Sequence, residues 1–549
     1  MLWTEIIIPK MGVMKTDDQT VVKVKLSHLK VIFFALIIFS IALVVRYVGL
    51  NFAFPLLTHP DEGIIMNRLK GMSVNHSLDP LSYPYPAFPS YYSKFIVLNA
   101  LSKLRFGVNY GLGYWNDPHF FYTASRLMTA VHGALLPVVA WFIGRKFKQS
   151  NFSWVAAVLF TFYPVFVLHS HYVTVDIPLT LFVMLVLLFC LNYLSTKRND
   201  WLILASVMVA ISGLEKYPGI LSVGIVWTSV AIRAFSRDEQ NSLPGWRFFF
   251  KNTAWSLGLT ILAFFLIAPQ LFLNFSTTLN NLVREARPTH LGADGLGWGG
   301  NLLFYLKNFY SNSGLIISAL AGVGLTAVIL MKDPTYLLLF FGGGYWVALS
   351  ILHLHHIRWS LPMMTTPLFL AAIGISYLWQ KTVKRLPARM ALIVIVLAGI
   401  VPFALKGMVT SIMLTWSDTR NEALDFLEEN DITTENTFSD GYTPFNPANK
   451  NRDFFKFDIF NPGEKEYIVL SSLMFDRYAA EPDRYVAQNA FYANVRSNLE
   501  LIKEFHPDPE PNLVVDQLKV ILEYLNSQFR NSKPLFFSGP TLEIYKLQE

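Results

Sequence analysis

Apolar runs of about 20 residues recur along this chain and constrain its fold more than any other feature. A helix needs about 20 apolar residues to cross a membrane, and about eleven runs approach that length. They lie near residues 30–49, 122–145, 152–170, 176–194, 201–214, 217–234, 252–272, 314–331, 335–352, 360–379 and 389–410. Glu215 and Lys216 interrupt the 201–234 region, which makes it the least regular part of the pattern. The sequence predicts a polytopic membrane protein with an all-α membrane domain of about eleven spans.

Composition agrees with this prediction. The chain has 549 residues, of which 53% are hydrophobic and 15% charged, which is too apolar for one soluble domain. The net charge of +7 comes from Lys and Arg in short segments between apolar runs, a pattern of membrane topology and not of nucleic-acid binding. The single cysteine, Cys190, lies within an apolar run, so neither a disulfide framework nor a thiolate metal cluster is expected.

The basic segments predict the orientation. The first run follows Lys23, Lys25 and Lys30 and has no small-residue cleavage site after it, so we expect a retained signal anchor with a cytoplasmic segment at 1–29. The segments "GRKFKQ", "STKRND", "MKD" and "QKTVKRLPAR" then all fall on the cytoplasmic side. Successive spans alternate in direction across the membrane. From this start, 30–410 is the predicted membrane domain, with extracytoplasmic loops at 51–121 and 273–313 and an extracytoplasmic tail at 411–549.

The tail has the composition of a small soluble α/β domain. "TRNEALDFLEEND" predicts an amphipathic helix, "EYIVLSS" and "TLEIYKL" predict strands, and "NAFYANVRSNLELIKEF" predicts a further helix. In the first outer loop, "YYSKFIVLNALSKL" at 91–104 has the mixed polarity of a helix that lies on the membrane surface.

Two carboxylates stand where the first outer loop begins a helix. Asp61 and Glu62 follow Pro60, which biases His59 away from helical conformation. Acids in a first helical turn can simply stabilise the helix start. A third acid, Asp176 in "HSHYVTVDIPLT", is predicted on the same side of the membrane. Carboxylates at membrane depth are costly and usually line a cavity or pathway, so a functional site is the competing interpretation.

Cations are predicted on this face as well. They are Arg126, Lys216, Arg284, Arg287 and Arg358. Each one alone could be a snorkelling or paired side chain, but several near the acids indicate a site for an anion such as phosphate. His169, His171, His353, His355 and His356 are possible phosphate donors or metal ligands. A divalent metal is possible, although their spacing matches no ligand signature.

Several motifs together resemble a known family. They are "HPDE" in the first outer loop, "YTASRLMTAVHGALLPVVAWFIGRKF", "HSHYVTVDIPLTLF" and "HIRWSLPMMTTPLFL", in this order. This order resembles the membrane glycosyltransferases of the GT-C fold, in the superfamily of protein O-mannosyltransferases and lipid A aminoarabinose transferases (glycosyltransferase family 39). The tail is similar to the C-terminal domains of bacterial and archaeal members, so the resemblance covers nearly the whole chain.

The resemblance implies a function and roles for residues. The donor would be a sugar on a polyprenyl phosphate, transferred with inversion at the outer face of the plasma (inner) membrane. Asp61 matches the catalytic base, Glu62 is its neighbour, and Asp176 matches a second acidic position. Arg358, Lys216, His356 and Arg126 are candidates for binding the donor phosphate.

The acceptor is left open. The outer segment 273–313 is too short for the β-trefoil insert of eukaryotic protein mannosyltransferases, so a glycan or lipid acceptor stands beside a protein one. The alternative function is a transporter or flippase of a lipid-linked or anionic substrate, for which inverted repeats and broken helices would be the signature. No matching halves occur, and the charges collect at one face.

Overall fold

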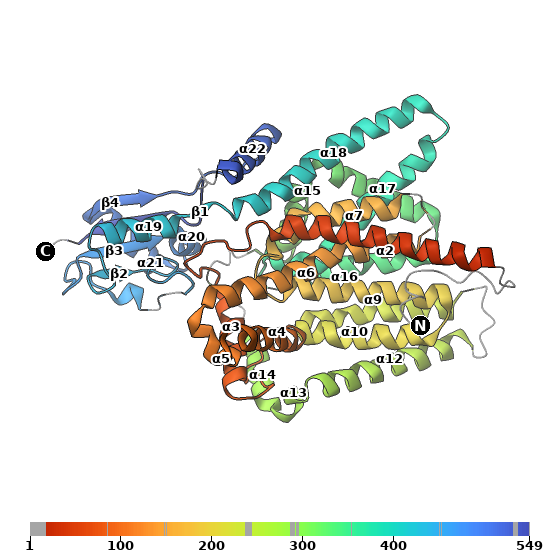
Figure 1. The fold of residues 1–549 in the computed structure, drawn as a ribbon, viewed down its shortest axis with the longest axis horizontal. Coiled ribbons are helices and arrows are strands. Elements are labelled where there is room, and N and C mark those ends of the chain that lie inside the picture. The colour runs from red at the N-terminus through yellow and green to blue at the C-terminus, as the bar shows by residue number, and fades with distance from the viewer. Residues whose placement is uncertain are drawn as a thin grey trace.

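The computed structural model describes residues 18–547 apart from 85, 148, 150, 237–243, 286–290, 292–295, 353, 450, 452 and 531–535. Arg287, His353 and the first 17 residues of the predicted cytoplasmic segment therefore lie outside the described residues. Long helices run side by side, and the strands gather beyond one end of them (Figure 1). We name this end of the bundle the domain end.

Within the part of the chain that the structure describes, eight helical segments are long and apolar enough to cross a membrane, which confirms the all-α membrane domain. They are the apolar part Leu29–Tyr47 of α2 (Asp18–Tyr47), α6 (Pro118–Gly144), α9 (Asp176–Thr196), η2 (Tyr217–Ser222) with α11 (Val223–Ala234), α12 (Gly245–Ile267), α15 (Trp298–Met331), η4 (Ile357–Ser360) with α17 (Leu361–Thr382), and α18 (Leu386–Met413).

Three other predicted spans consist of shorter elements that run alongside these helices (Figure 1). They are α7 (Phe152–Phe162) with α8 (Pro164–His169), α10 (Asn199–Glu215), and η3 (Pro334–Phe340) with α16 (Phe341–Ser350). Pro164 separates α7 from α8 because the residue before a proline avoids helical conformation, and Tyr163 is extended with ψ 114°. Glu215 ends α10 and accepts hydrogen bonds from the amide of Ser90, at 3.1 Å, and from its hydroxyl.

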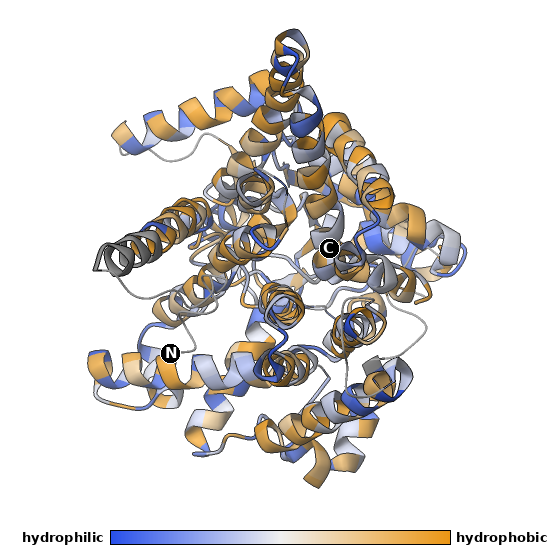
Figure 2. Cartoon of the chain, turned by 90° about the vertical axis from the view of Figure 1, so that its right-hand side faces the viewer, coloured by the Kyte–Doolittle hydropathy of each residue, from blue (hydrophilic) through white to orange (hydrophobic). Residues whose placement is uncertain are grey.

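Glycines allow the closest helix contacts in the bundle. A Cβ atom on Gly324 of α15 would lie 1.8 Å from the carbonyl oxygen of Leu370 in α17, and one on Gly374 would lie 2.1 Å from that of Leu320. Gly342, in the "GGGY" stretch of α16, is packed in the same way, since a Cβ atom there would lie 2.6 Å from the carbonyl oxygen of Met363. Small residues at such crossings let helix backbones approach each other. Hydrophobic residues also cover the outside of the helices (Figure 2), as contact with lipid requires.

The segment predicted as the second outer loop, 273–313, differs from expectation. It contains α14 (Phe275–Glu285) and the first part of α15, which begins at Trp298 and not near residue 314. A break with φ 75° at Gly314 separates this part from the rest of α15. The mixed polarity of "WGGNLLFYLKNFYSNS" hid the helix from an apolar-run criterion, because such a helix exposes polar residues on one side.

The first outer loop folds at the domain end. It forms α3 (Pro60–Val74), α4 (Phe88–Phe106), α5 (Tyr110–Gly113) and η1 (Tyr114–Asn116), followed after Asn116 by α6. α4 confirms the predicted helix at 91–104. It buries Tyr91 and Leu98 and exposes Ile96 and Leu104 at 67% and 85%.

The C-terminal residues form a small α/β domain. Its main sheet has the order β2 (Thr437–Ser439), β3 (Tyr467–Ser471), β6 (Leu542–Lys546), β4 (Glu500–Phe505), with only β2 and β3 parallel. Short β1 (Ser417–Asp418) pairs with β5 (Phe537–Ser538), and the helices are α19 (Thr419–Glu429), α20 (Ser472–Ala479) and α21 (Val486–Asn498).

The predicted helix of α19 and the strands β3 and β6 are confirmed. The sequence predicts one helix through "NAFYANVRSNLELIKEF". Its first half is confirmed as α21, but the prediction of helix for "ELIKEF" is wrong. This segment is β4, because it pairs with β6 in the sheet, where Leu501 lies opposite Tyr545.

A last helix, α22 (Val514–Arg530), has two different faces. Val520 packs with Val409, Ile412 and Trp416 at the end of α18. The other face exposes an apolar stripe of Val515, Leu518, Leu522, Leu525 and Phe529, with exposed fractions from 44% to 90%. α18 has 28 residues and so spans about 42 Å, more than the roughly 30 Å hydrocarbon core, which places its last turn near the lipid headgroups. We therefore expect α22 to lie on the membrane surface, with the stripe in lipid.

This expectation can be tested with single cysteines carrying an environment-sensitive fluorophore, in full-length protein in nanodiscs. Cys190 is replaced by Ser so that only the introduced cysteine reacts. A label at Leu522→Cys should be quenched by lipids brominated near the headgroup end of their chains, whereas a label at exposed Asp516→Cys should not. Equal quenching at both positions would contradict a surface location. Quenching at neither position, with a dimer in solution, would assign the stripe to a second copy of the chain.

Candidate active site at the domain end

α3 begins where the sequence predicts. His59 is extended, with φ −86° and ψ 118°, and Pro60 is the first helical residue. Asp61 and Glu62 therefore lie in the first turn, but their carboxylates make ion pairs with two arginines from other helices. Their main contacts are thus these arginines and not the amides at the start of the helix.

Glu62 and Arg126 form a buried ion pair between α3 and α6. The Nε and Nη2 atoms of Arg126 donate to the two carboxylate oxygens at 3.0 and 2.7 Å, and both side chains are at most 1% exposed. Glu62 also accepts from the amide of Val173 at 2.9 Å. Arg126 donates to the carbonyls of Leu50 and Phe52 at 2.8 and 3.3 Å. The sequence suggested Arg126 as a contact for the donor phosphate. In the structure its side chain is buried and donates to Glu62 and to two backbone carbonyls, so it positions Glu62.

Asp61 and Arg358 form a second ion pair that is open to solvent. Arg358 lies in η4, and its Nη1 atom donates to Asp61 Oδ2. The side chains are 21% exposed for Asp61 and 32% for Arg358. The neighbouring acid of the "HPDE" motif is thus buried and fixed, while Asp61 remains accessible.

A third ion pair joins Asp176 to Lys216, at 2.7 Å. Asp176 begins α9, and Lys216 lies at the break between α10 and η2. The Lys216 ammonium is 5.9 Å from the ring centre of Trp359, the residue after Arg358. The His356 ring lies 4.8 Å from the same Trp359 ring. The third pair and His356 therefore both meet the indole of the residue that follows Arg358.

Aromatic rings connect these pairs. The His59 ring lies 4.3 Å from that of Tyr172, and the His169 ring lies 5.8 Å from Tyr172. Burial, and after it the positive charge of Arg358, hold the pKa of His59 well below its usual range. His59 is therefore neutral at neutral pH, so it adds no positive charge beside Asp61. Sequence reasoning missed both His59 and Tyr172 as site residues, although His59 directly precedes "PDE".

The remaining predicted residues lie apart from this cluster or serve the fold. His171 contacts the carbonyl oxygens of Val48 and Val167 at 2.7 and 2.9 Å, and His355 packs on Phe304 with ring centres 4.1 Å apart. Arg284 is exposed on α14. Among the described residues, no group of three His, Cys, Asp or Glu side chains is arranged to hold a metal.

The C-terminal domain lies close to the Asp61–Arg358 pair at the domain end. Tyr442 lies near Arg358, and the Arg477 guanidinium lies 5.0 Å from the centre of the Tyr442 ring. Asn421 of α19 donates to the carbonyls of Ala53 and Phe54 at 3.2 and 3.0 Å. The domain thus contacts the segment that leads into α3 and brings Tyr442 near the open ion pair.

Comparison with known proteins adds a family to this geometry. Residues 120–236, which run from the first turn of α6 past the end of α11, match the family described as dolichyl-phosphate-mannose-protein mannosyltransferase. This part of the chain is therefore similar to a family of glycosyltransferases. The matched segment includes Arg126, Asp176 and Lys216, while Asp61 and Arg358 lie outside it. No curated protein matches the chain.

Solved structures of GT-C glycosyltransferases are similar at low identity. Archaeal oligosaccharyltransferase AglB from Archaeoglobus fulgidus, in complex with an inhibitory peptide and a dolichol-phosphate, is 12% identical with a TM-score of 0.49, covering 94% of this chain and 88% of AglB. ArnT from Cupriavidus metallidurans bound to undecaprenyl phosphate is 14% identical with a TM-score of 0.48, covering 86% of this chain and 96% of ArnT. Its apo state gives 15% and 0.48 with the same coverage.

Removing one partner of the buried ion pair should destabilise the protein. Glu62→Gln or Arg126→Met leaves an uncompensated charge or unpaired polar groups in a buried site, a loss of about 3–5 kcal/mol for pairs of this kind. We expect a clearly lowered Tm in nanodiscs for each single variant, and partial recovery in the double variant Glu62→Leu with Arg126→Met. Single variants as stable as the wild type would show that the pair contributes nothing to folding.

A second prediction concerns Asp440, two residues before Tyr442. Burial raises the pKa of Asp440 to about 7, against the opposing effect of hydrogen bonds from Tyr492 and the Gly441 amide. The folded state thus keeps this proton to a higher pH than the unfolded chain. The contribution of Asp440 to the free energy of unfolding is therefore complete below about pH 4. It falls by on the order of 2–4 kcal/mol as the pH rises to about 7.

The measurement is hydrogen–deuterium exchange of the full-length protein from pH 4.5 to 7.5, corrected for the intrinsic rate. Peptides covering β2 and β3 should lose protection as pH rises, and Asp440→Asn should flatten this dependence. The control is Asp453→Asn, which removes an exposed carboxylate of the same domain. A slope unchanged by Asp440→Asn would assign the pH dependence to other groups.

Proposed function

We propose that this membrane glycosyltransferase moves a sugar from a polyprenyl-phosphate donor to an acceptor hydroxyl at the domain end of the bundle, with inversion of the anomeric centre. The observation that carries the proposal is the accessible Asp61–Arg358 pair, together with the Asp176–Lys216 pair whose ammonium reaches the ring of Trp359, the residue after Arg358. The family description names a dolichyl-phosphate-mannose donor, and AglB and ArnT have polyprenyl phosphates bound in their structures. Both support a lipid-linked donor.

The residue types fit a direct displacement. The oxygen of the acceptor hydroxyl bonds to the anomeric carbon, and Asp61 takes the proton from this hydroxyl at the same time. The bond from that carbon to the phosphate oxygen breaks, and the lipid phosphate departs with an additional negative charge. Arg358, Lys216 and His356 stabilise that charge by hydrogen bonds and electrostatic attraction. Glu62 supports Asp61 from the buried side, held by Arg126, and Asp176 positions Lys216 through their ion pair.

The ion pairing suggests how donor binding prepares the base. While Asp61 is paired with Arg358, the positive charge stabilises its ionised form and weakens it as a base. The phosphate of an incoming donor competes with Asp61 for Arg358 and, in the same way, with Asp176 for Lys216. Donor binding therefore frees the Asp61 carboxylate for the acceptor, so that proton removal follows donor capture.

The orientation is part of the proposal. Turns at the end opposite the domain end carry a group of basic residues. They are Arg145, Lys146, Lys197, Arg198, Lys332, Lys381, Lys384 and Arg385. Basic residues concentrate on the cytoplasmic side of membrane proteins. We therefore place the domain end, with Asp61 and the C-terminal domain, on the extracytoplasmic side of the plasma (inner) membrane.

Asp61→Asn tests the proposed base. Purified protein in nanodiscs is given a panel of polyprenyl-phosphate sugars with and without candidate acceptors, and sugar release and transfer are measured. Asp61→Asn should lower turnover at least 100-fold, because general-base catalysis contributes about 10²–10⁴-fold. Arg358→Gln should raise the donor KM and lower kcat as well, since it contacts the phosphate before and after bond breaking.

The matched control is Asp79→Asn, which removes another carboxylate of the first outer loop, one hydrogen-bonded to Tyr83. This variant should keep wild-type turnover, and all variants should elute as folded protein in size-exclusion chromatography. Wild-type turnover in Asp61→Asn would exclude Asp61 as the base. A donor that is carried across liposome membranes without losing its sugar would favour the transporter alternative.

A further inference from the structure

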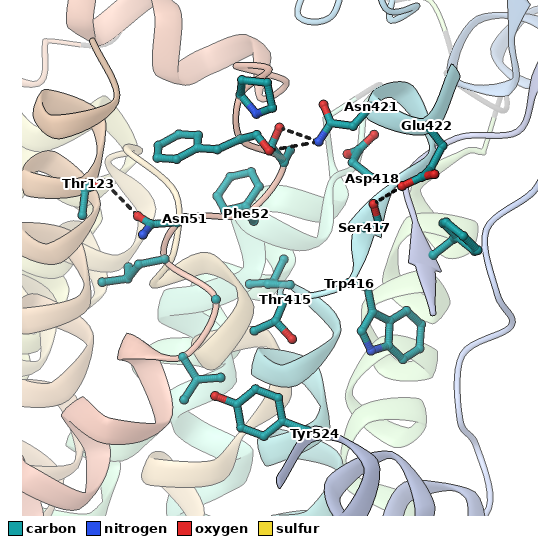
Figure 3. Close-up of a pocket in the computed structure, with 18 of the residues that line it drawn as sticks. Asn51, Phe52, Thr123, Thr415, Trp416, Ser417, Asp418, Asn421, Glu422 and Tyr524 are labelled. Atoms are coloured by element: carbon teal, nitrogen blue, oxygen red, sulfur yellow. Dashed lines mark hydrogen bonds between the residues drawn. The ribbon is translucent and has the colours of Figure 1, made fainter. Parts of the chain in front are cut away.

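A cavity of about 760 Å³ lies between the membrane domain and the C-terminal domain, separate from the ion pairs of the candidate active site. Its walls are the segment 47–55 after α2, the segment 414–418 after α18, and the helices α19 and α22. Figure 3 shows the residues of α19 on one side and Asn51 on the other, with Tyr524 of α22 below. Its size is in the usual range for small-molecule sites.

The cavity lies at the depth of the lipid headgroups. Two of its walls begin where the apolar spans of α2 and α18 end, at Tyr47 and Met413. A third wall is α22, which packs on the last turn of α18 and carries the exposed apolar stripe on its other side. A molecule that remains anchored in the membrane can therefore reach the cavity with its headgroup.

The lining excludes an anion and favours a sugar. Carboxylates of Asp418, Glu422 and Asp425 line the cavity, and none of the described residues around it is Lys or Arg. Among the residues that the structure describes, Arg420 pairs with Asp418 at 2.7 Å, and no such ion pair is found for Glu422 or Asp425. Phosphate would be repelled here, whereas carboxylates accept hydrogen bonds from hydroxyl and ammonium groups.

Aromatic residues line the cavity as well. Phe52, Trp416 and Tyr524 are drawn around it in Figure 3. Trp416 is 5% exposed and packs on Phe536, and Phe52 packs on Arg126, so the half-buried Tyr524 is the ring with room to contact the C–H face of a sugar. Asn51, held by Thr123 at 2.7 Å, adds an amide to the polar groups.

One wall connects the cavity to the candidate active site. The Phe52 ring centre lies 3.7 Å from the guanidinium carbon of Arg126, and its carbonyl accepts from Arg126 at 3.3 Å. Arg126 holds Glu62, the neighbour of Asp61. The Phe52 ring also meets the Tyr172 ring, with centres 5.3 Å apart, in the cluster around His59. Three residues, namely Phe52, Arg126 and Glu62, thus stand between a headgroup in the cavity and the proposed base.

We propose that this cavity binds the uncharged or cationic sugar headgroup of a membrane lipid. Phe52, Arg126 and Glu62 stand between the cavity and Asp61, so a headgroup bound here does not meet the proposed base. The cavity therefore holds the lipid beside the candidate active site, and this binding does not depend on the proposed glycosyl transfer.

The experiment measures lipid retention by native mass spectrometry of the full-length protein released from nanodiscs. The probes are glucosyl-diacylglycerol, glucosaminyl-diacylglycerol, diacylglycerol without sugar, and phosphatidylglycerol. Wild-type protein should retain at least one of the two glycolipids more than fivefold over diacylglycerol and over phosphatidylglycerol. Asp425→Arg should reduce this retention at least fivefold, because it places a bulky positive charge among the lining carboxylates.

Glu428→Arg is the matched control, since it makes the same kind of change at an exposed position of α19 outside the cavity, and it should retain glycolipid as the wild type does. Glu422→Gln, a smaller change, should give an intermediate loss. Equal retention by Asp425→Arg and Glu428→Arg, or no preference for either glycolipid over diacylglycerol and phosphatidylglycerol, would overturn the proposal. No donor or turnover is needed, so failure here leaves the Asp61 result unaffected, and failure of sugar transfer leaves retention measurable.

Discussion

The buried ion pair between Glu62 and Arg126 is the interaction on which the rest of the candidate site depends. It joins the start of α3 to α6, and through further hydrogen bonds it also fixes the chain at Leu50, Phe52 and Val173. A buried carboxylate requires such a partner, because an isolated charge away from water is very costly. Once Glu62 is fixed, the helix geometry fixes the neighbouring Asp61 as well.

Two adjacent carboxylates thus have opposite environments. Glu62 is enclosed and completely paired, while Asp61 and its partner Arg358 remain partly exposed. In the proposed function this difference separates positioning from proton transfer. The breaks in the membrane helices contribute to the same site. Lys216 follows the end of α10, and Arg358 lies in the short η4 before α17, so both cations sit at interruptions of apolar spans at the domain end.

Sequence patterns predicted the long elements well and the amphipathic ones less well. Spans such as α6, α9 and α18 were predictable because membrane thickness sets a length that apolar runs must meet. The first half of α15 and all of α22 mix polar and apolar residues, so an apolar-run criterion passes over them. The sequence predicts a helix where β4 forms, because "ELIKEF" has no strong local preference and its pairing with β6 decides its conformation.

The sequence by itself determined that the chain is a polytopic membrane protein, that α3 starts at Pro60, and that Asp61, Asp176, Lys216 and Arg358 belong to one face of the bundle. These conclusions follow from local properties, namely hydrophobic length, the conformational limits of proline and the order of charges along the chain. Only the tertiary structure decided which charges pair. Residues 61 and 358 are almost 300 positions apart, so no local pattern could assign Arg358 to Asp61 and Arg126 to Glu62. The cavity between α22 and segment 47–55 likewise arises only when the two domains pack together.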